Sequence, residues 1–133
     1  YSGVISLFMT RAASKQAPVI YGDGNQSRDF VYVQDVVKAN LLGAVMNQPQ
    51  GNIFNIGTGN QVRINRLWEL IATLSGQKKL APVYKPDRVG DILHSYADMD
   101  FTRSKLKFKP DFSLEQGLEM TFEWYRGQGS ADR

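Results

Sequence analysis

The feature that most constrains this chain is an alternation of short strand-like runs with longer amphipathic runs. Apolar residues recur at helical spacing in five stretches, which predicts helices over residues 3–15, 36–47, 65–75, 100–106 and 113–125. β-Branched and aromatic residues gather between them, which predicts strands over residues 19–21, 29–33, 53–57 and 80–86. The alternation indicates an α/β fold. Because so few strands cannot complete a doubly wound sheet, we expect a partial α/β unit with short strands and about five helices.

Polar residues ahead of the apolar runs indicate where the helices begin. The predicted N-caps are Asp35, Asn65, either Asp98 or Asp100, and Ser113. Ser113 stands three residues before Gln116, which is the spacing of a capping box. Gly76 predicts the end of the third helix.

The composition excludes several classes of protein. The 133 residues include no cysteine and one histidine, His94, which excludes a disulfide framework, a thiolate metal site and a paired-histidine metal site. The net charge of +3 comes from scattered basic residues, and this disfavours nucleic acid as a partner. No apolar run approaches the roughly 20 residues of a membrane span. We expect a cytoplasmic protein with no membrane partner.

One glycine pair resembles part of a cofactor loop. The segment Gly57–Gly59 follows a predicted strand, but Val62 occupies the offset at which a dinucleotide fingerprint needs a small residue. No acidic residue falls near 77–80. We therefore interpret these glycines as a tight turn.

Two isolated arginines, Arg28 and Arg88, each stand beside a glycine-marked loop. Guanidinium groups bind phosphate oxygens bidentately and keep their charge at neutral pH, so this pair is suited to a diphosphate. Asp91 is suited to accepting hydrogen bonds from a ribose diol. The alternative is a set of surface ion pairs worth little energy, in which Arg28 pairs with Asp23 or Asp29, and Arg88 with Asp87 or Asp91.

Five segments occur in an order and spacing typical of one family: YSGVISLF, IYGDGNQSRDFVYVQDVVKAN, FNIGTG, DRVGDILHSYAD and FSLEQGLEMTFEWY. Together they resemble the C-terminal part of the extended short-chain dehydrogenases/reductases, the NAD-dependent nucleotide-sugar epimerases and dehydratases. GDGNQSRDFVYVQD is most similar to the UDP-glucose and UDP-N-acetylglucosamine 4-epimerase branch.

The resemblance implies a division of labour. In that family an N-terminal Rossmann domain holds NAD, and a Tyr-x-x-x-Lys pair removes the sugar 4-hydroxyl proton while NAD takes the hydride. No tyrosine here has a lysine four residues on. We therefore expect no catalytic residue, a substrate-binding region over residues 1–126, a flexible tail over 127–133, and NAD bound by an N-terminal domain absent from this chain. The family commonly forms homodimers.

The resemblance also implies that eight residues contact the UDP-sugar substrate: Val4, Phe8, Val19, Tyr21, Arg28, Arg88, Asp91 and Ser95. The two arginines match positions that bind the diphosphate, and Asp91 the position that binds ribose. Val19 and Tyr21 match positions that line the uracil and ribose. Val4 and Phe8 match the helix that closes over the nucleotide, with a plain core role as the alternative. A small residue at the position of Ser95 implies room for an N-acetylated sugar.

Two alternatives stay open. Within the family, the complete protein could be a dehydratase or a UDP-glucuronate decarboxylase. In a different class, the chain could be a noncatalytic module that binds a nucleotide sugar or a partner protein. In either case the strand predicted over residues 53–57 lacks neighbours here, so we expect the isolated chain to self-associate or fold poorly.

Overall fold

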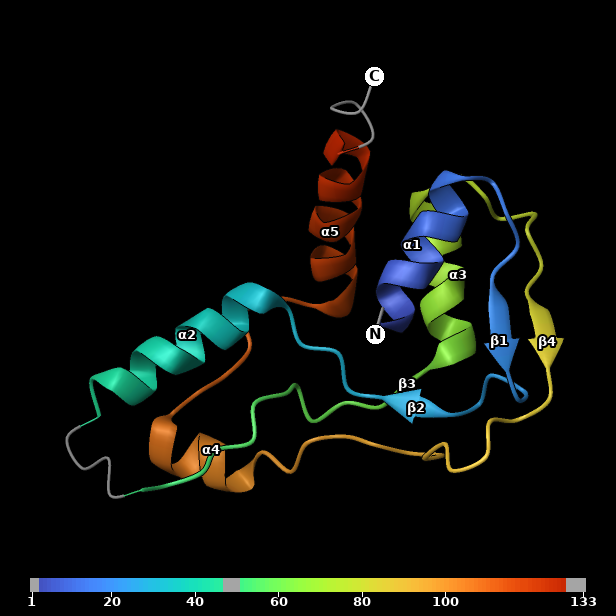
Figure 1. The fold of residues 1–133 in the computed structure, drawn as a ribbon. Coiled ribbons are helices and arrows are strands. Elements are labelled where there is room, and N and C mark those ends of the chain that lie inside the picture. The colour runs from blue at the N-terminus through green and yellow to red at the C-terminus, as the bar shows by residue number, and fades with distance from the viewer. Residues whose placement is uncertain (1–2, 47–50, 129–133) are drawn as a thin grey trace.

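The computed structural model describes residues 3–46 and 51–128, and Figure 1 shows their arrangement. The described part of the chain contains the five helices that the sequence predicts: α1 (Val4–Ala13), α2 (Val33–Ala44), α3 (Ile64–Leu74), α4 (Asp100–Leu106) and α5 (Leu114–Gln128). Its four strands are short: β1 (Val19–Tyr21), β2 (Ser27–Arg28), β3 (Val62–Arg63) and β4 (Val83–Lys85). None of these helices combines the length and apolar character of a membrane span.

The strands form two small two-stranded sheets. β1 pairs with β4 in parallel, with Val19 opposite Val83. β2 pairs with β3 antiparallel, with Ser27 opposite Arg63. Figure 1 shows β1 and β4 beside α1 and α3, on the side away from α5.

The larger core joins α1, α3 and α5. Phe8 of α1 packs edge-on against Trp68 of α3, with ring centroids 5.5 Å apart. Leu67, Ile71 and Leu118 are also fully buried in this cluster. The apolar faces predicted for α3 and α5 are therefore confirmed, because their periodic positions meet each other and α1.

A second, smaller core joins α2 and α4, which stand apart from the three-helix layer in Figure 1. Its buried members are Ala39, Met99, Leu106 and Phe108. Asp35 is also buried, and its carboxylate accepts hydrogen bonds from the backbone N–H groups of Asp111 and Phe112, at 2.8 and 3.4 Å. This carboxylate fastens α2 to the segment that leads into α5.

That role corrects the N-cap predicted at Asp35, because α2 begins earlier, at Val33. The cap predicted at Asn65 is wrong for a similar reason: Asn65 lies inside α3 and its side-chain amide donates to the carbonyl of Asp23, 2.9 Å away. In both cases the side chain bonds a distant segment instead of its own helix start. The Ser113–Gln116 capping box is confirmed by reciprocal hydrogen bonds of 2.9 and 3.2 Å.

Two further predictions concern the residue that caps the start of α4 and the residue that ends α3. Met99 is the N-cap residue of α4, while the Asp98 carboxylate accepts a hydrogen bond from the N–H of Asp100 at 3.0 Å. Gly76 has φ +71°, which confirms it as the stop after α3. α5 continues through Gln128, and residues 129–133 of the predicted tail lie outside the described residues, as does Tyr1.

Two predicted strands are wrong. Residues 29–32 run without a strand partner into α2, and residues 52–56 form no strand, with Ile53 almost fully exposed. A strand needs a neighbour to receive its backbone hydrogen bonds, and the described part of the chain supplies none at either place. β-Propensity alone therefore overpredicts strands here.

Candidate functional site

A cavity of about 270 Å³ lies among α1, β1, β2 and the loop after β4. Seven of the eight residues proposed to contact substrate line this cavity: Val4, Phe8, Val19, Tyr21, Arg28, Arg88 and Asp91. They come from α1, β1, β2 and the loop after β4, and Arg28 and Asp91 are 63 residues apart in sequence. The eighth, Ser95, lines a neighbouring cavity.

Arg28, at the end of β2, is held against the loop after β4. Its guanidinium donates to the Asp91 carboxylate at 2.6 Å, to the Ile92 carbonyl at 2.6 Å and to the Ser27 carbonyl at 2.8 Å. The Arg28 and Asp91 side chains remain 28% and 39% exposed, so the pair faces the cavity opening. Three of the five guanidinium donors are thus engaged within the described residues, and two remain for a ligand.

Arg88 lies in the loop after β4 and lines the same cavity. Its guanidinium carbon lies 3.9 Å from the centroid of the Tyr21 ring, which is cation–π geometry. Hydrogen bonding to the Arg88 guanidinium, together with its positive charge, lowers the pKa of the Tyr21 phenol. In the described residues Arg88 forms no ion pair with Asp87 or Asp91, in contrast to the surface-pair alternative.

Ser27 explains why Asp91 lies next to Arg28. The buried Ser27 donates its N–H to the Leu93 carbonyl at 2.8 Å and accepts the Ser95 N–H at 3.1 Å. Its hydroxyl lies 2.9 Å from His94 Nδ1. These contacts place residues 93–95 alongside β2, with a parallel bridge between Ser27 and His94. The bridge positions Asp91 and Ser95 near Arg28.

Phe8 and Val4 differ in what they can offer a ligand. Phe8 is 2% exposed and belongs to the three-helix core, so it forms the floor of the cavity. Val4 is partly buried and keeps some surface at the cavity wall. The core role considered for these residues from sequence therefore describes Phe8.

Sequence reasoning missed Gln26, which also lines the cavity. Its side-chain amide donates to the Tyr21 carbonyl at 2.7 Å and so spans the Gly22–Asn25 turn between β1 and β2. A polar residue immediately after a glycine-rich turn was the available signal. Leu7, Ile20 and Ile64 complete the apolar lining.

The neighbouring cavity, about 340 Å³ in volume, shares Arg28 with the first. Ser95 lines it together with residues of the Gly57 turn and Tyr96. Since Arg28 borders both spaces, one ligand with a charged centre could extend into each of them.

Asp29 organises the wall of this second cavity. Its carboxylate accepts the N–H groups of Thr58 (3.0 Å), Gly59 (2.8 Å) and Ala97 (3.3 Å), and the Thr58 hydroxyl at 2.5 Å. Gly59 has φ +76°, and a Cβ on Gly57 would lie 2.5 Å from Asp29 Oδ2. From sequence, Asp29 was expected only as a possible ion-pair partner of Arg28, and its role in holding the Gly57–Gly59 turn was not predicted.

The same carboxylate decides the interpretation of Gly57–Gly59. The backbone N–H groups that a phosphate would need are already bonded to Asp29, so this turn does not fit a dinucleotide. The prediction of a tight turn is confirmed. Within the described residues, no group of three acidic or histidine side chains is placed to hold a metal ion.

A model of the NAD dependent epimerase/dehydratase family matches residues 1–57. UDP-glucose 4-epimerase of Thermotoga maritima, solved with UDP-glucose, is 41% identical and superposes with a TM-score of 0.87 over 96% of this chain. The chain belongs to the NAD-dependent epimerase/dehydratase family. It corresponds to a C-terminal part of these proteins, as the sequence predicts.

Two further family members show the range of reactions. UDP-N-acetylglucosamine 4-epimerase of Methanobrevibacter ruminantium, solved with UDP-N-acetylmuramic acid, is 39% identical, with a TM-score of 0.88 over 96% of this chain. UDP-N-acetyl-alpha-D-glucosaminuronate decarboxylase of Bacillus cytotoxicus is 32% identical over 95% of the chain. The chain spans about 40% of the length of all three family members.

Proposed function

We propose that this chain is the substrate-binding part of an NAD-dependent UDP-sugar 4-epimerase, in which it binds the diphosphate and ribose of the nucleotide sugar. The observation that carries the proposal is the single cavity lined by seven predicted residues from α1, β1, β2 and the loop after β4. The UDP-sugars present in the Thermotoga and Methanobrevibacter relatives support it.

The chemistry of the cavity fits a nucleoside diphosphate. Arg28 keeps two donors for phosphate oxygens, and the Arg88 guanidinium adds a second permanent positive charge. Asp91 uses one carboxylate oxygen for Arg28, which leaves the other to accept a ribose hydroxyl. Tyr21 and Val19 supply the flat and apolar surface that a base and ribose need.

NAD supplies hydride transfer in this family, and the described residues offer no dinucleotide-binding loop for it. The Gly57–Gly59 turn is occupied by Asp29, and no tyrosine has a lysine four residues on. We therefore assign NAD and the catalytic tyrosine and lysine to an N-terminal domain outside this chain, and to this chain the binding and orientation of substrate.

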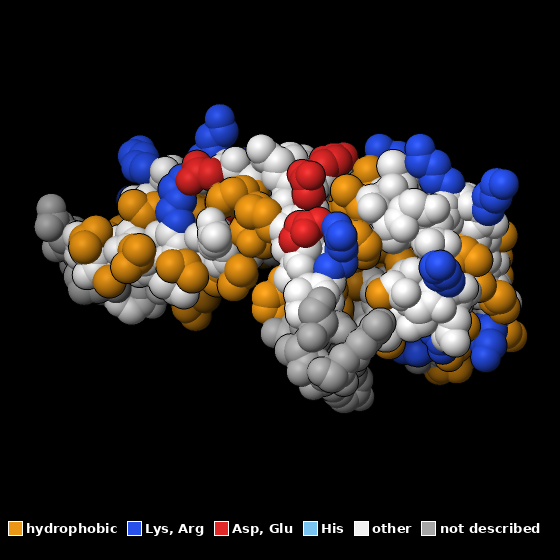
Figure 2. All heavy atoms as spheres, turned by 90° about the horizontal axis from the view of Figure 1, so that it is seen from above, with side chains coloured by type: hydrophobic (Ala, Val, Ile, Leu, Met, Phe, Trp, Pro, Cys, Tyr) orange, Lys and Arg blue, Asp and Glu red, His pale blue; other side chains and the backbone are white. Residues whose placement is uncertain are grey.

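An exposed apolar face supports a further domain. Val33, Val37 and Leu41 recur every four residues on α2, and the C-cap residue Val45 continues this spacing; each is at least half exposed. Figure 2 shows hydrophobic side chains gathered over this helix at the left of the view. A helix face this apolar is normally covered, and a domain that contributes a sheet would cover it.

Ser95 bears on the sugar. Its small side chain lines the cavity that adjoins Arg28, where a hexose attached to the diphosphate would extend. By volume, this leaves room for an acetamido group, and we propose that UDP-N-acetylglucosamine or its galacto isomer is accepted. An enzyme that took UDP-glucose but bound the N-acetyl sugar about tenfold worse would contradict this.

The experiment that tests the proposal is a chimera. This chain replaces the matching 40% of the Thermotoga enzyme, and interconversion of 4-epimeric UDP-sugars is assayed. We expect epimerisation, and its loss in the same chimera carrying Arg28→Ala. A folded chimera that binds NAD but neither binds UDP nor turns over would overturn the proposal.

The Bacillus cytotoxicus relative favours a second candidate, a uronate decarboxylase with the same diphosphate cavity. Both reactions begin with oxidation at the sugar 4-position, and we assign the residues that separate them to the part of the protein outside this chain. The complete protein should therefore also be given UDP-glucuronate, with release of carbon dioxide as the readout. A noncatalytic module is distinguished by UDP binding without turnover in every assembly tested.

A further inference from the structure

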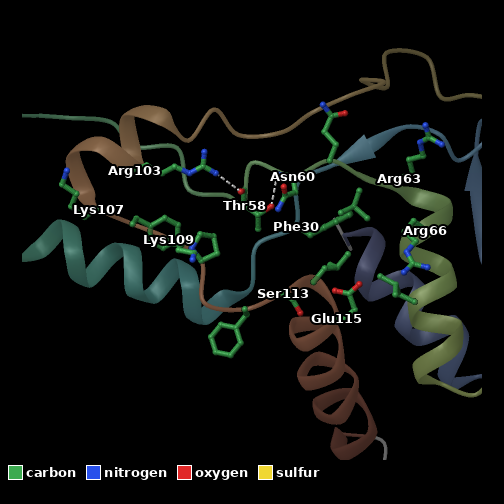
Figure 3. Close-up of a pocket in the computed structure, with 17 residues that line it drawn as sticks. Phe30, Thr58, Asn60, Arg63, Arg66, Arg103, Lys107, Lys109, Ser113 and Glu115 are labelled. Carbon is green, nitrogen blue, oxygen red and sulfur yellow. Dashed lines mark hydrogen bonds between the residues drawn. The ribbon is translucent and has the colours of Figure 1, made fainter.

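A larger groove of about 1010 Å³ shares no residue with the two cavities above. It lies among the GTGN segment, the starts of α3 and α5, and the connection from α4 to α5 (Figure 3). Five basic side chains line it, namely Arg63, Arg66, Arg103, Lys107 and Lys109, against one carboxylate, Glu115. Such an imbalance makes the groove electropositive.

The basic residues form two groups. Figure 3 shows Arg103, Lys107 and Lys109 at the α4 end of the groove, and Arg63 and Arg66 at the α3 end. Phe30 lies between the two groups in the same view. The lining between and around them includes the apolar Val62, Leu70 and Leu114. The polar Thr58, Asn60 and Gln61 also line it, so the floor is mostly but not wholly apolar while the ends are charged.

The α4 end holds charge that the fold does not use. Among the described residues, the Lys107 and Lys109 ammonium groups have no ion pair or hydrogen bond. Arg103 pairs with Asp100 only at 3.8 Å and donates to the Thr58 carbonyl at 3.3 Å. Lys107 has φ +54°, a left-handed conformation rare outside glycine, and the chain turns there along the groove.

The α3 end is similar in character. Arg66 pairs with Glu69 at 3.2 Å, but both side chains are more than half exposed, so water and salt compete with this pair. Exposed pairs of this kind exchange partners at little cost. Both ends of the groove can therefore meet a negatively charged ligand.

We propose that this groove binds an extended acidic peptide of a partner protein, with carboxylates at both ends and apolar residues in its centre. Because Figure 3 shows the two basic groups at opposite ends of the groove, a ligand that contacts both groups has to be extended. Charge complementarity thus selects the partner, and apolar contact adds affinity.

The test uses the complete protein that contains this chain and a fluorescein-labelled heptapeptide with two aspartates at each end and leucine, phenylalanine and leucine in the centre. Fluorescence polarisation should show saturable binding that weakens as salt rises. The double variant Lys107→Glu and Lys109→Glu should bind about tenfold more weakly or worse. Circular dichroism checks that each variant keeps its helices.

A matched control separates the groove from overall charge. Lys78→Glu with Lys79→Glu changes the net charge equally, and neither residue lines the groove. This control should bind within about twofold of the original chain. Equal losses in the two double variants would overturn the proposal, because they would indicate nonspecific attraction.

Three further probes complete the test. A peptide with serines in place of its apolar centre should bind more weakly, and equal binding would overturn the role of the apolar floor. Competition by inorganic phosphate at the affinity of the peptide, or tighter binding of an oligothymidylate, would assign the groove to a phosphate or to nucleic acid and overturn the peptide proposal.

Discussion

Arg28 and Asp91 stand 63 residues apart in sequence, and their side chains lie 2.6 Å apart at the mouth of one cavity. The pair orients the guanidinium from one side while leaving donors on the other. A cation held by its own chain is preorganised for phosphate, because little side-chain freedom is lost when the ligand binds.

Arg28→Lys should weaken UDP binding by roughly 10- to 100-fold, since a lysine cannot reproduce several directed hydrogen bonds worth about 1.5–3 kcal/mol in charged contacts. Isothermal titration of the chain, or of the complete protein, measures this. Arg66→Lys, in the other groove, is the control and should leave UDP affinity unchanged. If the Arg28→Lys variant bound UDP as tightly as the original chain, Arg28 would not be part of the UDP site.

Asp29→Asn should destabilise the fold by about 1–3 kcal/mol, because an amide cannot accept all the hydrogen bonds from Thr58, Gly59 and Ala97. Urea unfolding followed by circular dichroism measures the difference in free energy. The control, Asp111→Asn, removes only an exposed pair with Lys38 and should cost less than about 0.5 kcal/mol. A similar loss of unfolding free energy in both variants would show that Asp29 does not hold the Gly57–Gly59 turn in place.

Gly57→Ala should destabilise by about 1–3 kcal/mol, because its Cβ would lie 2.5 Å from the Asp29 carboxylate and 2.7 Å from the Ala97 Cβ. Gly43→Ala in α2 is the matched control, since its Cβ would meet nothing within 4 Å and alanine favours the helix. Thermal melts of the two variants should therefore shift in opposite directions. A neutral Gly57 variant would show that the turn relaxes freely.

Tyr21 should ionise at a lower pH than an ordinary tyrosine, because hydrogen bonding to Arg88 and its charge lower the phenol pKa. The lowered pKa adds stability that grows as pH rises from the folded value to the ordinary value near about 10, and it is absent at lower pH. Ultraviolet absorbance of the phenolate measures the titration. Arg88→Gln should return the Tyr21 pKa toward its ordinary value. An unchanged titration would show that Arg88 does not lower this pKa.

The isolated chain should self-associate through the exposed face of α2. Val37→Lys with Leu41→Lys should reduce association, because two charges on the apolar face oppose its burial. Gln34→Lys with Asn40→Lys, on exposed polar positions of the same helix, adds equal charge as a control. Sedimentation velocity distinguishes the species, and a monodisperse, cooperatively melting monomer of the original chain would contradict the prediction.

The helices could be predicted well and the strands poorly, for a physical reason. An amphipathic helix satisfies its own backbone hydrogen bonds. The spacing of Leu67 and Ile71 was therefore enough to place α3, and that of Leu114 and Leu118 to place α5. A strand depends on a neighbour. The run at residues 53–57 has the composition of a strand but no partner within the described residues.

The caps show the same limit. Ser113 and Gln116 bond each other across one turn, so sequence spacing was sufficient. Asp35 and Asn65 have the residue types of N-caps, yet each bonds a segment far along the chain. Their roles depended on which segments the fold brings close.

By itself, the sequence determined the α/β alternation, the helix faces and the residue types suited to a diphosphate, because these depend on contacts within a few residues. Only the tertiary structure decided that Arg28 pairs with Asp91, that Arg88 lies against Tyr21 and that Asp29 holds Gly59. A side chain has many chemically equivalent candidate partners in a sequence, and the packing of distant segments decides which of them lie within reach.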